Sequence, residues 1–245
     1  MGLGFEIKKC SKDSRARVGL VRTSHGPFLT PAFMPVGTGA TVKALSPHDL
    51  RGAGVEIILC NTYHLYLRPG HEVIGELGGL HQFMGWDGPI LTDSGGFQVY
   101  SLSKLRKIEE EGILFQSHLD GSRHFFTPRL AIEIQEELGS DIAMVLDDCP
   151  PYPCTYERAK SSVMRTLRWA ESSKEAKGLK GQALFGIVQG SLFRDLREEC
   201  LKGLTKIGFD GYAIGGLAVG EDRGKRLAIL RDLLPQMPPE SPRYL

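Results

Sequence analysis

The chain alternates short, continuously apolar runs with longer segments whose apolar residues recur every three or four positions. Continuous apolar runs of about four to eight residues are typical of strands buried on both faces of a parallel sheet. The strands predicted in this way are Phe28–Val36, Glu56–Cys60, Pro89–Thr92, Asp141–Leu146, Ala183–Val188 and Gly211–Ile214, and Pro242–Leu245 looks like the start of a seventh.

Helical segments fall between the later strands. Thr127 followed by Pro128 is a typical helix start, and Thr155 can cap a second helix. A third apolar stripe runs from Leu192 to Ile207 and is closed by Gly208, and a fourth runs from Leu227 to Leu234. Ile113–Phe126, with Asp120-Gly121 inside it, interrupts this rhythm and is predicted to be an inserted β-hairpin.

Alternating strands and helices predict an α/β fold with a parallel sheet, either doubly wound or closed into a barrel. Polar or glycine residues follow strand after strand, which favours a barrel, because a barrel builds its site from many strand ends. Only six strands and the start of a seventh are present, so we expect an incomplete (β/α)8 TIM-type barrel. Residues 1–245 would then be a fragment of one barrel domain, cut from a longer protein. The strand ends in question carry Gly37-Thr38, Asn61, Asp93, Asp147, Gln189 and Gly215-Gly216.

Composition narrows the class of protein without identifying a partner. A length of 245 residues with 41% hydrophobic and 24% charged residues is typical of a folded globular chain, and the net charge of +1 neither favours nor excludes nucleic acid. No segment approaches the ~20 apolar residues that span a bilayer, and the N-terminus lacks a signal-peptide pattern. Five scattered cysteines indicate reduced thiols. We therefore expect a cytoplasmic protein that does not associate with membranes.

Asp93 is a candidate catalytic acid, because it ends a predicted strand and two glycines follow Ser94. Such an aspartate can face a cleft that backbone N–H groups also reach. A turn or cap aspartate is the equally plausible structural interpretation. Asn61, at the end of the neighbouring strand, could hold Asp93 by a hydrogen bond or be a simple turn residue.

A second group of residues suits a flat heterocycle. A carboxylate at Asp147 could accept both N–H donors of a guanine-like edge, although a solvated loop pair with Asp148 is an equally good interpretation. Gln189 offers a donor and an acceptor on one amide. Gly215-Gly216 has no side chains, so its backbone groups are accessible for hydrogen bonding. Phe97 could stack on a base, although core packing is the commoner role of a lone phenylalanine.

The histidines and the basic clusters do not indicate any further functional site. His64, His118 and His124 lie near these segments, but no spacing indicates a metal site or a Ser–His pair. The basic clusters at Lys8–Arg17 and Arg165–Arg168 are interpreted as solvated faces.

Four longer motifs resemble the tRNA-guanine transglycosylase family, also called queuine tRNA-ribosyltransferase. The resemblance extends from about Phe5 to Leu245, and Cys149 together with Leu217–Gly220 is similar to the bacterial branch. The motifs are Asn61–Leu65 with Arg68–Gly70, Leu91–Gln98, Phe185–Gly190 and Gly208–Glu221.

The resemblance implies a (β/α) barrel that exchanges guanine for 7-aminomethyl-7-deazaguanine at the wobble position of tRNAs with GUN anticodons. The reaction would pass through a covalent ribosyl-enzyme intermediate on an aspartate. Asp93 matches the family's general acid/base, Leu217 contributes a backbone contact, and Glu221 matches an acid that controls backbone orientation in the pocket. The residues that match base and substrate binding are Ser94, Gly95, Gly96, Phe97, Asp147, Gln189, Gly215 and Gly216, with Asn61 behind Asp93.

The resemblance also implies parts that we do not find here. The family's nucleophilic aspartate and its structural zinc ligands are expected beyond Leu245, so we assign no nucleophile and no metal ligand in this chain. The resemblance makes residues 1–245 the N-terminal two-thirds of a single transglycosylase barrel domain. The implied partners are tRNA and the 7-deazaguanine base, and the implied assembly of the full-length protein is a homodimer. Two alternatives stay open: a non-catalytic RNA-binding subunit, and a glycoside hydrolase barrel that uses Asp93 and Asp147 as its carboxylate pair.

Overall fold

The computed structural model describes residues 2–102 and 105–245, and these fall into two compact units. The first unit comprises Met1–Gly95, Leu130–Met144 and Lys177–Ala183. The second comprises Gly96–Arg129, Val145–Ala176 and Leu184–Leu245.

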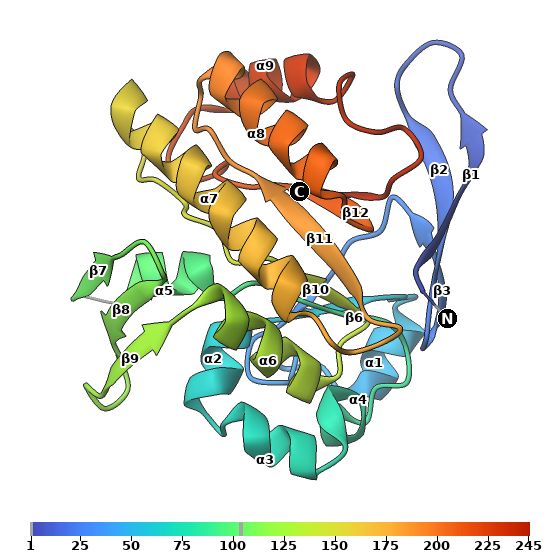
Figure 1. Ribbon diagram of the computed structural model, residues 1–245. Helices are drawn as coiled ribbons and strands as arrows, with labels where there is room; N and C mark the ends of the chain where they lie inside the picture. The colour runs from blue at the N-terminus through green and yellow to red at the C-terminus, as the bar shows by residue number, and fades with distance from the viewer. Residues whose placement is uncertain (1, 103–104) are drawn as a thin grey trace. The chain divides into compact units, whose positions relative to one another are not determined.

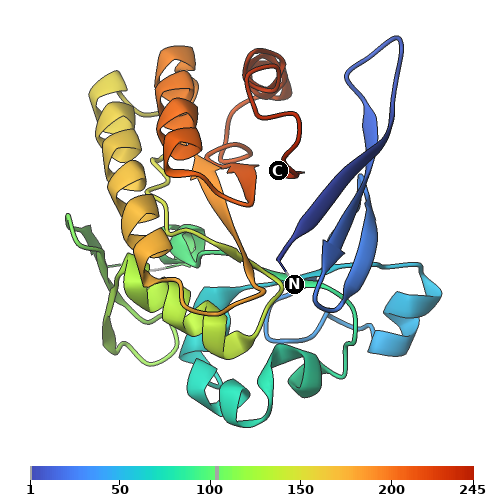
Figure 2. The ribbon, with the colours of Figure 1, turned by 45° about the vertical axis from the view of Figure 1, so that its right-hand side comes forward.

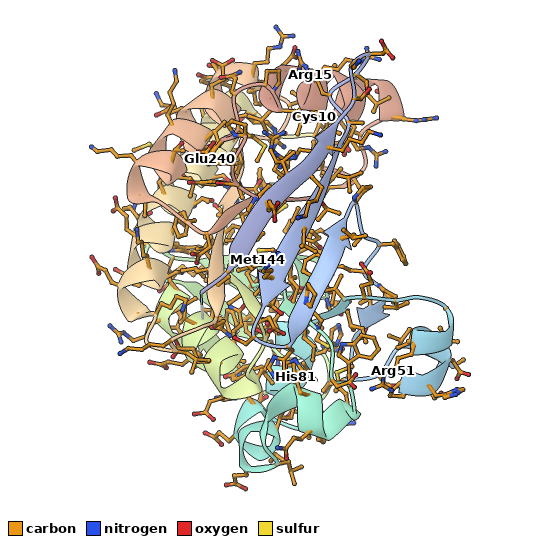
Figure 3. The ribbon with its side chains drawn as sticks, turned by 90° about the vertical axis from the view of Figure 1, so that its right-hand side faces the viewer. Cys10, Arg15, Arg51, His81, Met144 and Glu240 are labelled. Carbon is orange, nitrogen blue, oxygen red and sulfur yellow. The ribbon has the colours of Figure 1, made fainter. Side chains whose placement is uncertain are left out.

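The first unit begins with an antiparallel sheet in the order β1-β2-β3, drawn in blue in Figure 1 and facing the viewer in Figure 3. Its turn between β2 and β3 is closed by the Thr23 hydroxyl, which donates to the Gly26 carbonyl over 2.9 Å. Gly26 has a φ of 113°, a conformation that favours glycine. The strands are β1 (Gly4–Cys10), β2 (Arg17–Thr23) and β3 (Gly26–Thr30).

The same unit contains four parallel strands in the order β4-β5-β6-β10. Every residue of β5, β6 and β10 is buried, as continuous apolar runs predict. These strands are β4 (Val36–Gly37), β5 (Ile58–Cys60), β6 (Ile90–Thr92) and β10 (Ile142–Met144).

Short helices connect these strands. Ser46 caps the first of them in a reciprocal capping box with Asp49, which satisfies two N–H groups at the helix start. Pro128 begins α6, as predicted, and α6 lies in this unit from Leu130 on. The helices are α1 (Pro47–Gly52), α2 (Thr62–Leu67), α3 (His71–Glu76), α4 (Gly79–Met84) and α6 (Pro128–Leu138).

The prediction of one strand over Phe28–Val36 is wrong. Strand β3 ends at Thr30 in the antiparallel sheet, and β4 begins only at Val36 in the parallel one. Pro31 and Pro35 lie between them, and proline has no N–H to donate to a ladder. Phe33 is 85% exposed, so the apolar run does not mark a buried strand over its whole length.

The second unit contains the parallel strands β11, β12 and β13. Val188 pairs with Ile214, which sets the ends of β11 and β12 level. Strand β11 starts in the first unit, where the N–H of Ala183 donates to the Asp141 carbonyl over 2.8 Å. The strands are β11 (Ala183–Val188), β12 (Gly211–Ile214) and β13 (Arg243–Tyr244).

Three helices follow the predicted stripes in this unit, and α7 and α8 run side by side in Figures 1 and 2. The hydroxyl of Thr155 accepts from the N–H of Arg158, which confirms the predicted cap. Gly208 ends the next helix with a φ of 82°. The helices are α7 (Tyr156–Ala176), α8 (Arg194–Ile207) and α9 (Arg223–Leu233).

The inserted segment contains one helix and a three-stranded antiparallel sheet in the order β7-β8-β9. The predicted hairpin corresponds to β8 and β9, and β7 adds a strand that the pattern did not reveal. Phe115 and Phe126 are fully buried in edge contact, and each such side chain contributes about 1.5–3 kcal/mol on burial. The elements are α5 (Gly96–Leu102), β7 (Arg106–Ile108), β8 (Ile113–Gln116) and β9 (Arg123–Phe126).

The α/β class is confirmed. The parallel strands β4, β5, β6, β10, β11, β12 and β13 occur in chain order with helices between most of them, as expected for an incomplete TIM-type barrel. The six predicted strands and the start of a seventh are all present, apart from the divided first run. Among the described residues, no helix has the length and apolar character needed to cross a bilayer.

Candidate functional site

In the first unit, Asp93 lies directly after β6 and is half-buried. Its carboxylate accepts hydrogen bonds from Asn61 Nδ2 at 2.5 Å, from the N–H of Thr62 at 2.9 Å and from the N–H of Gly95 at 3.2 Å. All three partners are N–H donors, so both carboxyl oxygens of Asp93 act as acceptors. The predicted hydrogen bond from Asn61 is confirmed, and Asp93 is held in one orientation.

The register of the parallel strands brings these residues together. Cys60 pairs with Thr92, so the residues that follow, Asn61 and Asp93, leave the sheet at the same level. Asn61 is the residue before α2, and the Thr62 hydroxyl donates to the Asp93 carbonyl. Thr62 is therefore a second support of Asp93, which the sequence analysis did not single out.

The loop after Asp93 carries four of the predicted substrate-binding residues. In the first unit Ser94 is buried, and Gly95 has a φ of 80°, which turns its N–H toward the Asp93 carboxylate. In the second unit Gly96 begins α5, and Phe97 is 45% exposed. Core packing is therefore the wrong interpretation of Phe97, while its stacking on a base stays a prediction.

In the second unit, Asp147 and Gln189 lie side by side and are both buried. Gln189 Nε2 donates to Asp147 Oδ2 over 2.5 Å, and the backbone N–H of Gln189 donates to Cys200 Sγ. Gln189 Oε1 is buried and has no hydrogen-bond partner within the described part of the chain. An unsatisfied buried acceptor costs about 1–3 kcal/mol, so this atom is suited to a ligand that donates.

Gly215 and Gly216 leave the space that the Gln189 amide occupies, because neither has a side chain. A Cβ on Gly215 would lie 2.6 Å from Ile187 Cγ2 and 2.7 Å from Gln189 Nε2, and one on Gly216 would collide with Gln189 Oε1. Gly216 also has a φ of 62°. Any larger residue at either position would displace the amide that contacts Asp147.

Leu217 is half-buried, and the loop that follows it is fixed by Glu221. The Glu221 carboxylate accepts from the N–H groups of Ala218 at 2.6 Å and Val219 at 3.0 Å. Burial alone would raise the pKa of Glu221, but these hydrogen bonds and the charge of Arg226 outweigh it and lower the pKa. The carboxylate is therefore ionised at neutral pH and determines which way this loop backbone faces.

A small cavity in the second unit is bordered by Asp147 and by the start of α5. Its lining includes Gly96 and Tyr100 from the inserted segment and Cys149 from the strand end. Asp147 therefore borders open space on one side and contacts Gln189 on the other. Two of the predicted substrate-binding residues, Gly96 and Asp147, share this cavity.

Asp148 is buried, and its carboxylate contacts arginines of α7. Arg158 donates to both of its carboxylate oxygens, at 2.9 and 2.7 Å, and Arg165 donates to one at 2.6 Å. Arg165 and Arg168 also pair with Glu110 of the inserted segment. The interpretation of Asp147-Asp148 as a solvated loop pair is therefore wrong, and so is that of Arg165 as part of a solvated face.

The thiols beside the site are not nucleophiles at neutral pH. Burial, followed by the charge of Asp93, raises the pKa of Cys60 to about 12. Burial, followed by the charges of Asp147 and Asp148, raises the pKa of Cys149 to about 12. Both cysteines are therefore protonated, and a reactive cysteine needs the opposite shift.

Arg197 is a buried residue that the sequence analysis missed. Its guanidinium donates to the carbonyls of Ser191 at 2.6 Å, Gly215 at 3.0 Å and Gly216 at 3.3 Å. The sequence does contain a pattern that places Arg197 in the buried stripe of α8. Arg197, Cys200 and Leu204 lie on one helix face at spacings of three and four residues. A cation in an apolar stripe indicates a buried role.

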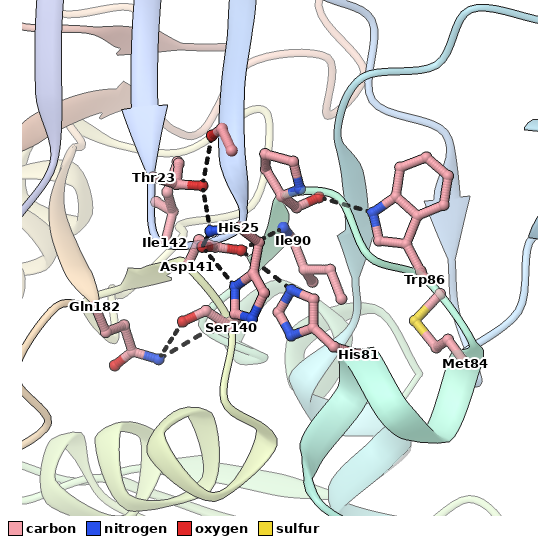
Figure 4. A network of polar contacts seen from close by, with 12 residues as sticks. Thr23, His25, His81, Met84, Trp86, Ile90, Ser140, Asp141, Ile142 and Gln182 are labelled. Atoms are coloured by element: carbon pink, nitrogen blue, oxygen red, sulfur yellow. Dashed lines mark hydrogen bonds and ion pairs between the residues drawn. The ribbon is translucent and has the colours of Figure 1, made fainter. Parts of the chain in front are cut away.

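In the described part of the chain, His25, His81 and Asp141 form the one cluster with ligand types that suit a metal ion (Figure 4). Both imidazoles face the buried Asp141 carboxylate, at 2.9 Å for His25 Nδ1 and 3.2 Å for His81 Nε2. The two rings are stacked with centroids 3.5 Å apart. A metal ion lies in the plane of each imidazole that binds it, and two stacked rings cannot both meet this condition for one ion. The cluster therefore does not fit a structural zinc.

The Asp141 cluster instead joins the β2–β3 turn to the starts of β6 and β10. The carboxylate also accepts from the N–H groups of His25 at 3.1 Å and Ile90 at 2.9 Å. Burial alone would raise the pKa of Asp141, but the contacts with His81, Ile90 and His25 outweigh it and lower the pKa to about 2. These contacts satisfy the carboxylate without a metal.

Comparison with known proteins agrees with the resemblance. The family model described as queuine tRNA-ribosyltransferase matches residues 10–245. The chain is 56% identical over 246 residues to the queuine tRNA-ribosyltransferase of Desulforudis audaxviator, covering 100% of this chain and 66% of that protein. It is 58% identical over 242 residues to the protein of the same name from Macrococcus caseolyticus, covering 98% of this chain and 64% of that protein.

The chain thus spans about two thirds of the length of the curated relatives it matches. A match over nearly the whole chain at this identity decides against the glycoside hydrolase alternative. The chain belongs to the queuine tRNA-ribosyltransferase family.

Proposed function

We propose that this chain carries the base pocket and the general acid/base of a tRNA-guanine transglycosylase. The substrates would be tRNAs with GUN anticodons, in which guanine at the wobble position is exchanged for 7-aminomethyl-7-deazaguanine. The observation that carries this proposal is the buried pair Asp147 and Gln189 beside Gly215-Gly216.

The donor and acceptor pattern of this pair suits guanine. The Asp147 carboxylate can accept from the ring N1–H and the exocyclic amine, two adjacent donors that adenine does not offer in this arrangement. Gln189 Nε2 carries a second hydrogen for a base acceptor, and its partnerless Oε1 can accept a further N–H. An apolar ligand would leave these buried polar groups unsatisfied.

In this proposal Asp93 moves the proton. When the bond between guanine and the ribose breaks, the ribose carbon bonds to an enzyme aspartate, and Asp93 in its acid form protonates the leaving base. Asp93 then takes the proton of the incoming base as that base displaces the aspartate. Asn61, Thr62 and Gly95 hold the Asp93 carboxylate for both steps.

In this proposal none of Asp93, Asp147 and Asp148 is the aspartate that bonds to the ribose. Asp93 and Asp147 match other roles in the family, and Asp148 is held by two arginines. We propose that this nucleophile and the family's zinc ligands lie outside these 245 residues. On family membership alone we also propose a homodimer in the cytoplasm.

The proposal is tested with the protein produced as its gene encodes it. Labelled guanine is supplied with a tRNA that has a GUN anticodon and, as control, with the same tRNA carrying adenosine at the wobble position. We expect label to enter the first tRNA only, and D147N to reduce incorporation sharply. Equal labelling of both tRNAs, or none with the wild type, would contradict the proposal. Guanine binding without exchange would favour the non-catalytic subunit instead.

A further inference from the structure

Arg197 lies under the ends of β11 and β12 as a buried cation. It is 1% exposed, and its guanidinium donates only to backbone carbonyls, including Val188 at 3.2 Å from Nη1. Within residues 2–102 and 105–245, no carboxylate lies within ion-pair distance of it. Gly190 lets the arginine approach, because a Cβ there would lie 2.8 Å from Arg197 Cγ. A buried charge that forms no ion pair is costly. We therefore expect the contacts between Arg197 and these carbonyls to have a function.

The two carbonyls at Nη2 fix two peptide planes. Nη2 donates to the carbonyls of Gly215 and Gly216, at 3.0 and 3.3 Å. In a planar trans peptide the C=O and the N–H of the next residue point in opposite directions. The N–H groups of Gly216 and Leu217 therefore point away from Arg197. Neither has a hydrogen-bond partner among the residues that the structure describes.

The Gly216 peptide lies beside the Gln189 amide, where the proposed function would place a guanine base. A Cβ on Gly216 would collide with Gln189 Oε1, so the first peptide is next to the amide that contacts Asp147. In guanine the carbonyl at position 6 is adjacent to the ring N1–H. A base whose N1–H faces Asp147 would therefore direct that oxygen toward the two donors here, Gln189 Nε2 and the N–H of Gly216.

We propose that Arg197 is a positioning residue that fixes the Gly215–Gly216 and Gly216–Leu217 peptides so that their N–H groups recognise the carbonyl oxygen of the base. This inference rests on the proposed function. The arginine acts through the backbone and does not touch the base.

The charge of Arg197 strengthens these donors. Burial lowers the pKa of Arg197 to about 10, so it is still protonated at neutral pH. A cation on a peptide carbonyl draws electron density from that peptide, and its N–H becomes a better donor to a partly negative oxygen. Such an oxygen gains negative charge when guanine leaves the ribose, so the effect is largest in the transition state.

The experiment uses two substitutions of Arg197 and a matched control. R197K keeps the charge but not the fork that spans several carbonyls, and R197M removes both. R194M is the control, because Arg194 is on the same helix but exposed and paired with Asp232. Affinity is measured by calorimetry for guanine and for 6-thioguanine, which keeps the N–H edge but offers a weak sulfur acceptor.

We expect R197K to weaken guanine binding about 10- to 100-fold, the range for lost charge-assisted hydrogen bonds, and to weaken 6-thioguanine binding much less. R194M should change neither affinity. An equal loss for both bases would mean that Arg197 is merely structural, and unchanged guanine binding by both folded variants, R197K and R197M, would mean that it has no role. Either result overturns the inference.

A second measurement separates this inference from the proposed function. If the wild type binds no guanine, the proposed function fails, and the crystal structure of R197K still tests the orientation of the peptides. Rotated peptides at Gly215 and Gly216 would support the positioning role, and unchanged peptides would overturn it. R197M serves the same purpose should R197K retain the carbonyl contacts through its ammonium group.

Discussion

Gln189 and Asp147 form a buried hydrogen bond of 2.5 Å, and each side chain follows a parallel strand. The bond joins a carboxylate to an amide, so the pair presents acceptors and donors together. Arginine or lysine at position 189 would present donors only. The pair is therefore adapted to a ligand with a mixed edge, and the two residues act as one recognition unit.

Replacement of Asp147 by asparagine should weaken guanine binding about 100-fold. The amide oxygen can accept one N–H of the base edge, but the NH2 group faces the second N–H as a like donor, at a cost of about 1–3 kcal/mol. Calorimetry with guanine measures the loss. D13N, a change of the same kind on an exposed loop, is the control and should bind as the wild type does. Wild-type affinity of D147N would remove Asp147 from base recognition.

Replacement of Asp93 by asparagine should lower kcat for guanine exchange by about 10²–10⁴-fold, the usual contribution of a general acid/base. Asparagine keeps the size of the side chain but cannot transfer the proton. Binding of free guanine should change little, because Asp147 and Gln189 hold the base edge. N61A should lower kcat less, since Thr62 and Gly95 still hold the carboxylate. An unchanged rate for D93N would show that another group moves the proton.

Alanine at Gly216 should destroy base recognition by displacing Gln189. The new Cβ would collide with Oε1, and alanine at a φ of 62° adds about 1–2 kcal/mol of backbone strain. G54A is a matched control, because Gly54 has a φ of 75° with open space around it and incurs only the strain. Both variants should lower the free energy of unfolding, but only G216A should lose guanine affinity. Similar affinities for the two would show that the Gln189 amide need not be held in place.

Acid should weaken the first unit through Asp141. Its pKa of about 2 in the folded chain is below the value of 3.8 in an unfolded one, so its contribution to stability is present above about pH 4 and is lost as the pH falls toward 2. The shift corresponds to about 2 kcal/mol. The free energy of unfolding of the wild type should therefore fall faster than that of D141N over this range. Parallel curves for the two proteins would show that Asp141 keeps an ordinary pKa.

Continuous apolar runs were enough to predict the buried strands, because parallel strands are covered on both faces and need no alternation. The same signal failed at Phe28–Val36, where Pro31 and Pro35 interrupt the ladder and Phe33 is exposed. Strand β7 was missed because its residues Arg106 and Lys107 are exposed and polar. The hydrophobic pattern indicates which residues are buried. An edge strand whose residues are mostly exposed therefore has no such pattern.

The candidate site was predicted better where residues lie next to a strand end than where they reach it from a helix. Asn61 and Asp93 follow paired strands, so their contact follows from register. The Arg197 contacts depend on how α8 packs, which no local pattern specifies. Asp147-Asp148 suited a solvated loop pair equally well, and only the arginines of α7 explain why a buried carboxylate is tolerated at Asp148.

Removal of the Asp148 charge should destabilise the second unit strongly. D148N leaves Arg158 and Arg165 without their buried partner, and breaking a buried ion pair from one side costs about 3–5 kcal/mol. E110Q is the control, because the same Arg165 pairs there with an exposed carboxylate whose loss should have little effect. Denaturant unfolding measures both. The backbone N–H of Asp148 also donates to the Thr166 hydroxyl, which keeps the strand end attached to α7. Guanine affinity of folded D148N should therefore fall less than that of D147N, and the opposite order would mean that Asp148, not its neighbour, faces the base.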